Sequence, residues 1–131
     1  MTDIVELTFP VASDLVVLAR LTAATVASRS GFDIEQIEDL RLAVDELCIS
    51  LIRGARGGRL SLRFVGEGDQ VEVSCVHVPG TEDDGTVVED DPALSELSTQ
   101  ILEALVDEHG RGRQDGHERA WLRKCRTLQQ A

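Results

Sequence analysis

One helix-forming run decides the fold: residues 33–53 have the sequence DIEQIEDLRLAVDELCISLIR. Asp33 and Gln36 stand three residues apart, in the arrangement of a capping box at a helix start. Apolar residues then recur at intervals of three and four, as one buried face of an α-helix requires. They are Ile37, Leu40, Val44, Leu47 and Leu51. Because Gly54 follows and glycine commonly ends a helix, the sequence predicts a helix from Asp33 to Arg53.

The same helix carries a second ordered line of residues, roughly 130° around the helix axis from the apolar stripe. The line consists of Asp39, Ala43, Glu46, Ser50 and Arg53. Small side chains stand between charged ones, which leaves room for something to lie along the helix. An ordinary solvated face would show no such order.

The N-terminal part predicts a strand followed by a helix. Residues Ile4–Phe9 alternate with period two, as a strand does, and Pro10 ends the alternation. Ser13 is placed to cap a helix that runs to about Ser30, where Gly31 stops it. The residues expected near one face of this helix are Leu15, Leu18 and Val26.

A β-hairpin and a loop are predicted after the central helix. Residues 60–65 and 71–76 alternate on either side of a glycine-containing turn at residues 66–69, which is typical of a hairpin. Residues 79–91 are polar and rich in acidic side chains, so we expect a loop there.

The C-terminal part predicts a third helix and a last strand. Asp91 caps this helix, Pro92 opens it and Gly110 ends it. Its apolar stripe consists of Leu94, Leu97, Ile101 and Leu105. Residues 110–116 predict a loop, and residues 119–126 a strand that carries Trp121 and Leu122.

This element order predicts an α+β fold, a two-layer sandwich with helices on one face of a small mixed sheet. The short hairpin connection pairs two strands antiparallel, while the crossovers that contain helices favour parallel pairing elsewhere. With 131 residues the chain is expected to form one domain, spanning residues 1–131.

Composition excludes several classes of protein. The net charge of -11 argues against direct nucleic-acid binding and favours a basic partner, unless it serves only solubility. Cys48, Cys75 and Cys125 are far apart in sequence and predict reduced, buried thiols. The N-terminal residues lack a basic region and no segment is apolar enough for a membrane span, so we expect a cytoplasmic protein without a signal peptide.

Residues 38–53, EDLRLAVDELCISLIR, resemble the N-box helix of the GHKL (histidine kinase-like) ATPases in its anti-sigma-factor form. They are especially similar to actinobacterial members of the RsbW-type family of anti-sigma factors and serine-protein kinases. The resemblance extends from Val5 to about Cys125 and includes the element order. It implies a GHKL or Bergerat-like fold with ATP and Mg²⁺ as cofactors.

The resemblance also implies roles for three residues. Glu46 takes the position of the general base, and a carboxylate there can accept a proton from a serine hydroxyl. Ser50 stands where the family has the asparagine that holds Mg²⁺. Arg20 matches an arginine that contacts both the sigma factor and its antagonist. The alternatives are a solvated or salt-bridged carboxylate for Glu46 and an ordinary exposed helix arginine for Arg20.

The nucleotide motifs after the hairpin depart from the family pattern. His77 falls near the adenine-binding aspartate, and an imidazole accepts a hydrogen bond only through its unprotonated nitrogen. Asp83 or Asp84, with Gly85, could substitute if the loop shifts. Residues 90–95, DDPALS, replace a glycine box with carboxylates that repel phosphates. Residues 79–91 therefore predict a degenerate ATP lid.

The sequence leaves two functions open. The first is an anti-sigma factor that sequesters an alternative, stress-type sigma factor in a partner-switching system, with a partly degenerate ATP site. The resemblance implies an anti-anti-sigma factor as the competing partner and a homodimer as the assembly. The second is an active Mg²⁺-ATP-dependent serine protein kinase that phosphorylates the anti-anti-sigma factor. A sensor histidine kinase ATPase fragment is less favoured, because the sequence shows neither its substrate histidine nor its dimerisation helices.

Overall fold

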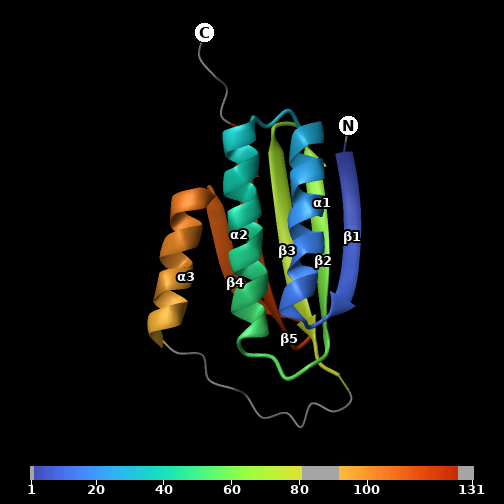
Figure 1. The fold of residues 1–131 in the computed structure, drawn as a ribbon, viewed down its shortest axis with the longest axis vertical. Helices are drawn as coiled ribbons and strands as arrows, with labels where there is room; N and C mark the ends of the chain where they lie inside the picture. Colours follow the sequence, from blue (N-terminus) through green and yellow to red (C-terminus); the bar gives the residue numbers. More distant parts are fainter. Residues whose placement is uncertain (1, 81–91, 127–131) are drawn as a thin grey trace.

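A computed structural model of the chain shows two layers, with helices covering one face of a β-sheet (Figure 1). The structure describes residues 2–80 and 92–126. Within these ranges, three α-helices pack on a five-stranded sheet, so the predicted α+β sandwich is confirmed. The strands, in their spatial order, are β1 (Thr2–Pro10), β2 (Arg59–Glu67), β3 (Gln70–Val78), β5 (His117–Cys125) and β4 (Glu108–Gln114).

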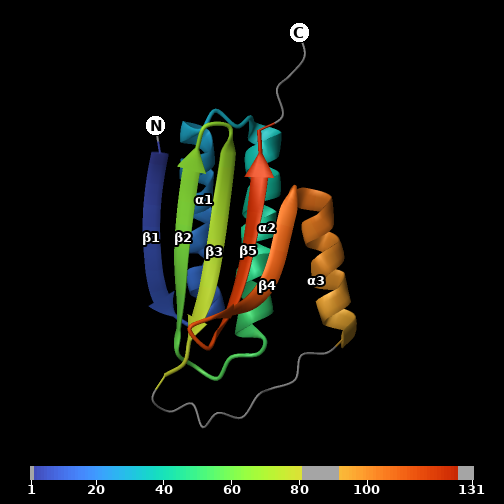
Figure 2. The same ribbon diagram turned by 180° about the vertical axis from the view of Figure 1, so that it is seen from behind.

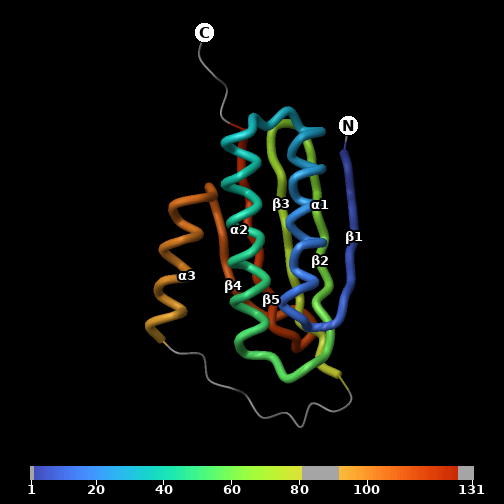
Figure 3. The backbone as a smooth tube through the Cα atoms, viewed as in Figure 1, coloured from blue at the N-terminus to red at the C-terminus, as the bar shows by residue number. Residues whose placement is uncertain are grey.

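The sheet is antiparallel at every neighbouring pair, so the prediction of a mixed sheet is wrong. Two helices, α1 (Val16–Arg29) and α2 (Ile34–Ile52), lie between β1 and β2 in the sequence. They run in opposite directions, so β2 begins at the end of the sheet where β1 finished and is antiparallel to it (Figure 3). Among the described residues, α3 (Pro92–Leu105) is the one helix between β3 and β4, and those two strands run in the same direction. However, β5 lies between them and is antiparallel to both.

Helix α1 begins later than predicted. A short 3₁₀ turn occupies Ser13–Leu15, and neither it nor α1 has a side-chain cap, so the capping role predicted for Ser13 is wrong. Small residues form much of the buried face, which consists of Val16, Ala19, Ala23, Val26 and Ala27. Alanines let α1 approach the rest of the core closely. Leu18 is not part of this buried face and is 40% exposed, whereas Val26 is buried as predicted.

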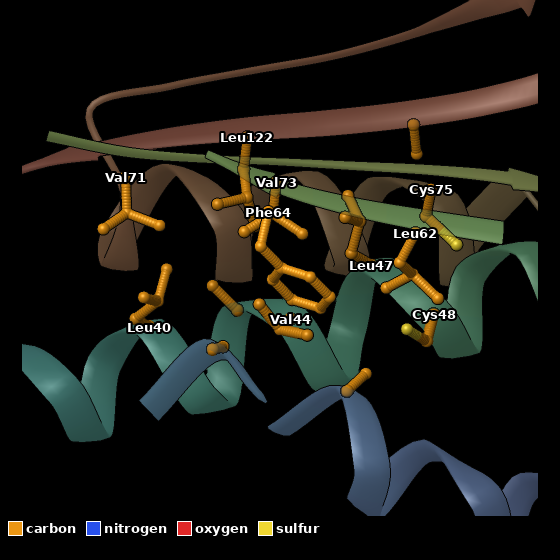
Figure 4. Packing of buried hydrophobic residues seen from close by; sticks show 14 of the residues in the cluster. Leu40, Val44, Leu47, Cys48, Leu62, Phe64, Val71, Val73, Cys75 and Leu122 are labelled. Carbon is orange, nitrogen blue, oxygen red and sulfur yellow. The ribbon is translucent and has the colours of Figure 1, made fainter. Parts of the chain in front are cut away.

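Helix α2 is the central packing element, and its predicted capping box is confirmed. The Asp33 side chain accepts a hydrogen bond from the backbone N–H of Gln36 at 2.8 Å, and the Gln36 side chain accepts one from the backbone N–H of Asp33 at 3.3 Å. Of the predicted stripe, Leu40, Val44, Leu47 and Leu51 are buried and Ile37 is partly buried. Figure 4 shows this face against side chains of the sheet, including Phe64, Val73 and Leu122.

The predicted hairpin is confirmed as β2 and β3, which are longer than expected and turn at Gly68 and Asp69. Alternate β2 residues Leu60, Leu62 and Phe64 point into the core. The opposite face of the sheet has no helix over it in Figure 2. In the part of the chain that the structure describes, no helix is long and apolar enough to cross a membrane.

The C-terminal prediction is partly wrong, because α3 ends at Leu105 and residues 108–114 form β4 instead of helix and loop. The predicted last strand is confirmed as β5. Position 110 of β4 requires glycine, because a Cβ atom there would lie only 2.7 Å from Nε1 of Trp121, its cross-strand neighbour. A turn at Asp115 and Gly116, both with positive φ, joins the two strands.

We expect Lys124→Met to destabilise the protein. Lys124 on β5 is 12% exposed and donates a hydrogen bond to the carbonyl of Leu105 at 2.7 Å, which satisfies the C-terminal end of α3. A hydrogen bond that involves a charged group contributes about 1.5–3 kcal/mol, and methionine keeps the apolar stem. Urea unfolding should show this loss. Arg113→Met, at a 63% exposed side chain, should stay near wild type, and equal stability of both variants would contradict the capping role.

A pH-dependent contribution is expected from the pair that joins β1 to α1. Nε and Nη2 of Arg29 lie 2.7 and 3.3 Å from the two carboxylate oxygens of Asp3, and this hydrogen bonding lowers the pKa of Asp3. A lowered folded-state pKa stabilises the fold above the unfolded value, about 3.9, and the contribution is lost as pH falls through the folded value.

Asp3→Asn should therefore lower the Tm at pH 7, and the difference from wild type should shrink as the solution is acidified below pH 4. Thermal unfolding followed by circular dichroism across this range measures it. A difference that stays the same at every pH would mean that the carboxylate charge does not contribute.

Candidate functional site

A cleft of about 260 Å³ lies between α2, α3 and the adjoining strands β4 and β5. Its apolar floor is formed by Leu47, Leu102 and Ala120. Its polar lining consists of Ser50 from α2, Ser95, Ser98 and Thr99 from α3, and His109, Gly110 and Arg111 from β4. Of the five residues in the second line of α2, Ser50 is the one that lines the cleft.

Ser50 is the predicted site residue that the structure places in the cleft. Its side chain is buried, and its Oγ donates a hydrogen bond to the carbonyl of Leu47 at 2.8 Å. Thr99 is similar, since its Oγ1 donates to the carbonyl of Ser95 at 3.0 Å. With these protons engaged inside the helices, both hydroxyls can offer a ligand only their oxygen lone pairs.

Glu46 lies one turn before Ser50 but does not line the cleft. Its side chain is 16% exposed, and its Oε1 lies 3.7 Å from Nη1 of Arg53, seven residues further along α2. The carboxylate is thus neither free in bulk water nor unpaired. The ion pair with Arg53 holds this carboxylate in one orientation.

His77 is buried at the end of β3, and its Nε2 lies 2.8 Å from the carbonyl oxygen of Gly57. A carbonyl oxygen can only accept, so Nε2 carries the proton and Nδ1 is the acceptor of the neutral ring. Position 58, close by, requires glycine, because a Cβ atom there would clash with the carbonyl oxygen of Val78. His77 is not part of the cleft lining that contains Ser50.

The remaining predicted site residues lie elsewhere. Arg20 is on α1, on the other side of α2 from α3, and its Nε lies 3.2 Å from Oδ1 of Asp45 (Figure 1). Asp83 and Gly85 lie outside the described residues, as does most of the predicted lid at residues 79–91. The structure therefore brings Ser50 to the cleft, Glu46 near it, and Arg20 to a separate surface.

Sequence reasoning missed the contributions of α3 and β4. On α3, Ser95, Ser98, Thr99 and Leu102 recur at helical spacing, a pattern that could have been recognised as one face. On β4, His109 and Arg111 alternate with glycines and point to the helix side, because they pair with Leu122 and Ala120 of the core. Arg111 also lies 3.8 Å from Glu118.

Cys48 and Cys75 are buried as predicted, whereas Cys125 is only half-buried. A hydrogen bond to Cys48, together with burial, raises the pKa of the Cys75 thiol well above its usual value. These thiols of α2 and β3 therefore behave as core side chains (Figure 4).

The described lining fits Mg²⁺ poorly. This ion is usually bound through one or two carboxylates together with water and substrate phosphates, and the residues that line the cleft include no carboxylate. Over the described ranges 2–80 and 92–126, no group of three or more His, Cys, Asp and Glu side chains could hold a metal ion. The volume also falls just below the roughly 300–1,000 Å³ of ordinary small-molecule sites.

A family model described as a histidine kinase-like ATPase domain matches residues 9–120. The serine-protein kinase RsbW of Bacillus pumilus is 33% identical over 87 residues, which are 62% of this chain and 54% of that protein. The RsbW protein of Bacillus subtilis is 37% identical over 75 residues, which are 54% of this chain and 47% of that protein. The RsbW protein of Listeria monocytogenes is 34% identical over 77 residues, which are 56% of this chain and 49% of that protein. The chain spans about half the length of these curated relatives.

Proposed function

The chain belongs to the histidine kinase-like ATPase domain family, and from that premise we propose that it is an RsbW-like anti-sigma factor with a weakened nucleotide site. It sequesters an alternative, stress-type sigma factor and releases it when an anti-anti-sigma factor competes. The observation that carries the proposal is α2, whose confirmed capping box and buried stripe set Ser50 in a cleft and Glu46 beside it. The resemblance of this helix to actinobacterial anti-sigma factors makes that subtype part of the proposal.

The outer face of α1 is the surface we assign to the partner. Arg20 is held by Asp45 and remains 37% exposed, so its guanidinium is ordered before a partner arrives. Val17, Leu18 and Leu21 are exposed large apolar residues on the same helix. Arginine flanked by apolar side chains is the composition of an interface hot spot.

Charge supports the choice of partner. The chain carries 24 acidic and 13 basic residues, for a net charge of -11. A basic, DNA-binding protein such as a sigma factor would be attracted by this charge, which raises the rate of association. We also propose, from the resemblance, that the protein is a cytoplasmic homodimer.

The family implies ATP binding with Mg²⁺, and three contacts support the proposal that this site is weakened. Glu46 is engaged by Arg53, Ser50 donates to its own helix, and His77 donates to Gly57. If a nucleotide does enter, His77 Nδ1 would be the acceptor for an exocyclic amine. To bind a ligand through the atoms already engaged, Glu46, Ser50 and His77 would each have to give up or share a contact within the chain.

A second candidate is the active serine protein kinase. The small exposed fraction of Glu46 and its oriented carboxylate favour this alternative. Bound Mg²⁺-ATP would supply the phosphoryl group, and the contribution of this chain would be Glu46 as acceptor of the serine hydroxyl proton.

Partner binding can be tested with two arginines of equal exposure. Arg20 on α1 and Arg41 on α2 are both 37% exposed and both ion-paired. We expect a sigma factor from the same genome to bind wild type and Arg41→Ala alike in calorimetry, while Arg20→Ala loses about tenfold or more in affinity, ~1.4 kcal/mol. If folded wild-type protein binds none of the sigma factors, the proposed function fails. Equal effects of both substitutions would contradict only the assignment of the partner surface to α1.

The two candidate functions differ in their response to nucleotide. The weakened site predicts little or no saturable heat on titration with millimolar Mg²⁺-ATP, and no phosphate transfer to an anti-anti-sigma factor. The kinase predicts transfer that Glu46→Gln abolishes while nucleotide affinity is retained. Observing that second pattern would replace the weakened-site proposal, and Glu38→Gln, at an exposed carboxylate on the same helix, is the matched control.

A further inference from the structure

The helices leave one face of the sheet open (Figure 2). This face carries a second recess. A trough of about 410 Å³ crosses it, and its lining includes Ser61, Arg63, Ser74, Val76, Gln114 and Arg119. The buried residues of β2 and β5 alternate with these side chains and point to the helices, so the trough is separate from the cleft beside α2.

Positive charge gathers at one end of this face, in a protein that is strongly acidic. In the strand register, Val76 of β3 pairs with Arg119 of β5 on one side and with Ser61 of β2 on the other. Arg59 and Arg63 flank Ser61 on the same face of β2. The nearest carboxylate in the register is Glu6, which is already paired with Arg63 at 3.9 Å.

Glu72, the other carboxylate of the trough, lies further away. It is four residues before Val76 on β3, which corresponds to about 13 Å along the strand. Its negative charge therefore bears mainly on the opposite end of the trough, where Arg123 is its cross-strand neighbour.

Arg119 has no counter-ion among the described residues. Its side chain is half-buried, yet it forms no ion pair or hydrogen bond there, whereas most other arginines in residues 2–80 and 92–126 are ion-paired. Partial burial of an unpaired charge is unfavourable and favours an anion from outside the chain.

We propose that this trough binds a phosphate group. The guanidinium of Arg119 presents parallel N–H donors that match two oxygens of an oxyanion, and Arg59 adds charge. Ser61 accepts a hydrogen bond from Thr8 at 3.4 Å, which leaves its own hydroxyl proton available to donate. Ser74 and the Gln114 amide supply further donors on the same lining. This site is independent of the sigma-factor proposal, because none of its residues lies on α1, α2 or α3.

The single tryptophan of the chain provides a local reporter. Trp121 lies on β5 two residues from Arg119 and therefore on the same face of the sheet. Titrations of the full chain use inorganic phosphate in one arm and glycerol phosphate in the other, with chloride keeping the ionic strength constant. A tighter response to the ester would assign the site to phosphate esters, and equal responses would assign it to the phosphate group itself.

We expect a saturable change in Trp121 fluorescence in at least one arm, weakened about tenfold or more by Arg119→Gln and less by Arg119→Lys, because lysine keeps the charge but not the paired donors. Arg113→Gln, on β4 and paired with Glu118 at 3.3 Å, should bind as wild type does. Circular dichroism confirms that each variant is folded. Absence of a saturable change in both arms, or an unchanged response in Arg119→Gln, would overturn the proposal.

Discussion

The burial of one side of α2 against the sheet constrains the rest of the structure. Leu40, Val44 and Leu47 are fully enclosed, and each such side chain contributes about 1.5–3 kcal/mol relative to exposure. Because this stripe fixes the rotation of the helix about its axis, the line that contains Ala43 and Ser50 must face α3. The contacts of α1 and α3 on opposite sides of α2, and the cleft itself, follow from that rotation (Figure 1).

This arrangement separates two surfaces that could work independently. The cleft lies between α2 and α3, whereas Arg20 and the exposed apolar residues of α1 lie beyond the opposite side of α2. The candidate nucleotide side chains and Arg20 all have partners within the chain, but Glu46, Ser50 and His77 are buried or largely buried, whereas Arg20 remains 37% exposed on α1. A protein with this distribution can retain partner binding while nucleotide chemistry weakens, since the two depend on different residues.

Local patterns predicted the capping box of α2, its buried stripe and the β2–β3 hairpin, because each depends on residues close in sequence. Strand β4 could not be predicted in the same way. Its Gly110-Arg111-Gly112-Arg113 run has no apolar alternation, and its conformation depends on pairing with β5 and on Trp121 lying against Gly110. The antiparallel sheet was missed for a similar reason, since β5 inserts between two strands that run in the same direction.

Prediction of the site was limited by the same distinction. The family pattern led to Glu46 and Ser50, but the ion pair with Arg53 and the lining from His109, Arg111 and Ser98 depend on tertiary packing. Asp83 and Gly85 stay predictions, because they lie outside the described residues.

On the proposed function, partner binding by this chain does not depend on nucleotide. The affinity for the proposed sigma-factor partner, determined by calorimetry without nucleotide and again with saturating Mg²⁺-ATP, tests this directly. We expect equal affinities, within about twofold, which is ~0.4 kcal/mol. An affinity that rises tenfold or more with Mg²⁺-ATP would contradict it, because the cleft would then have to be occupied for the partner surface to form.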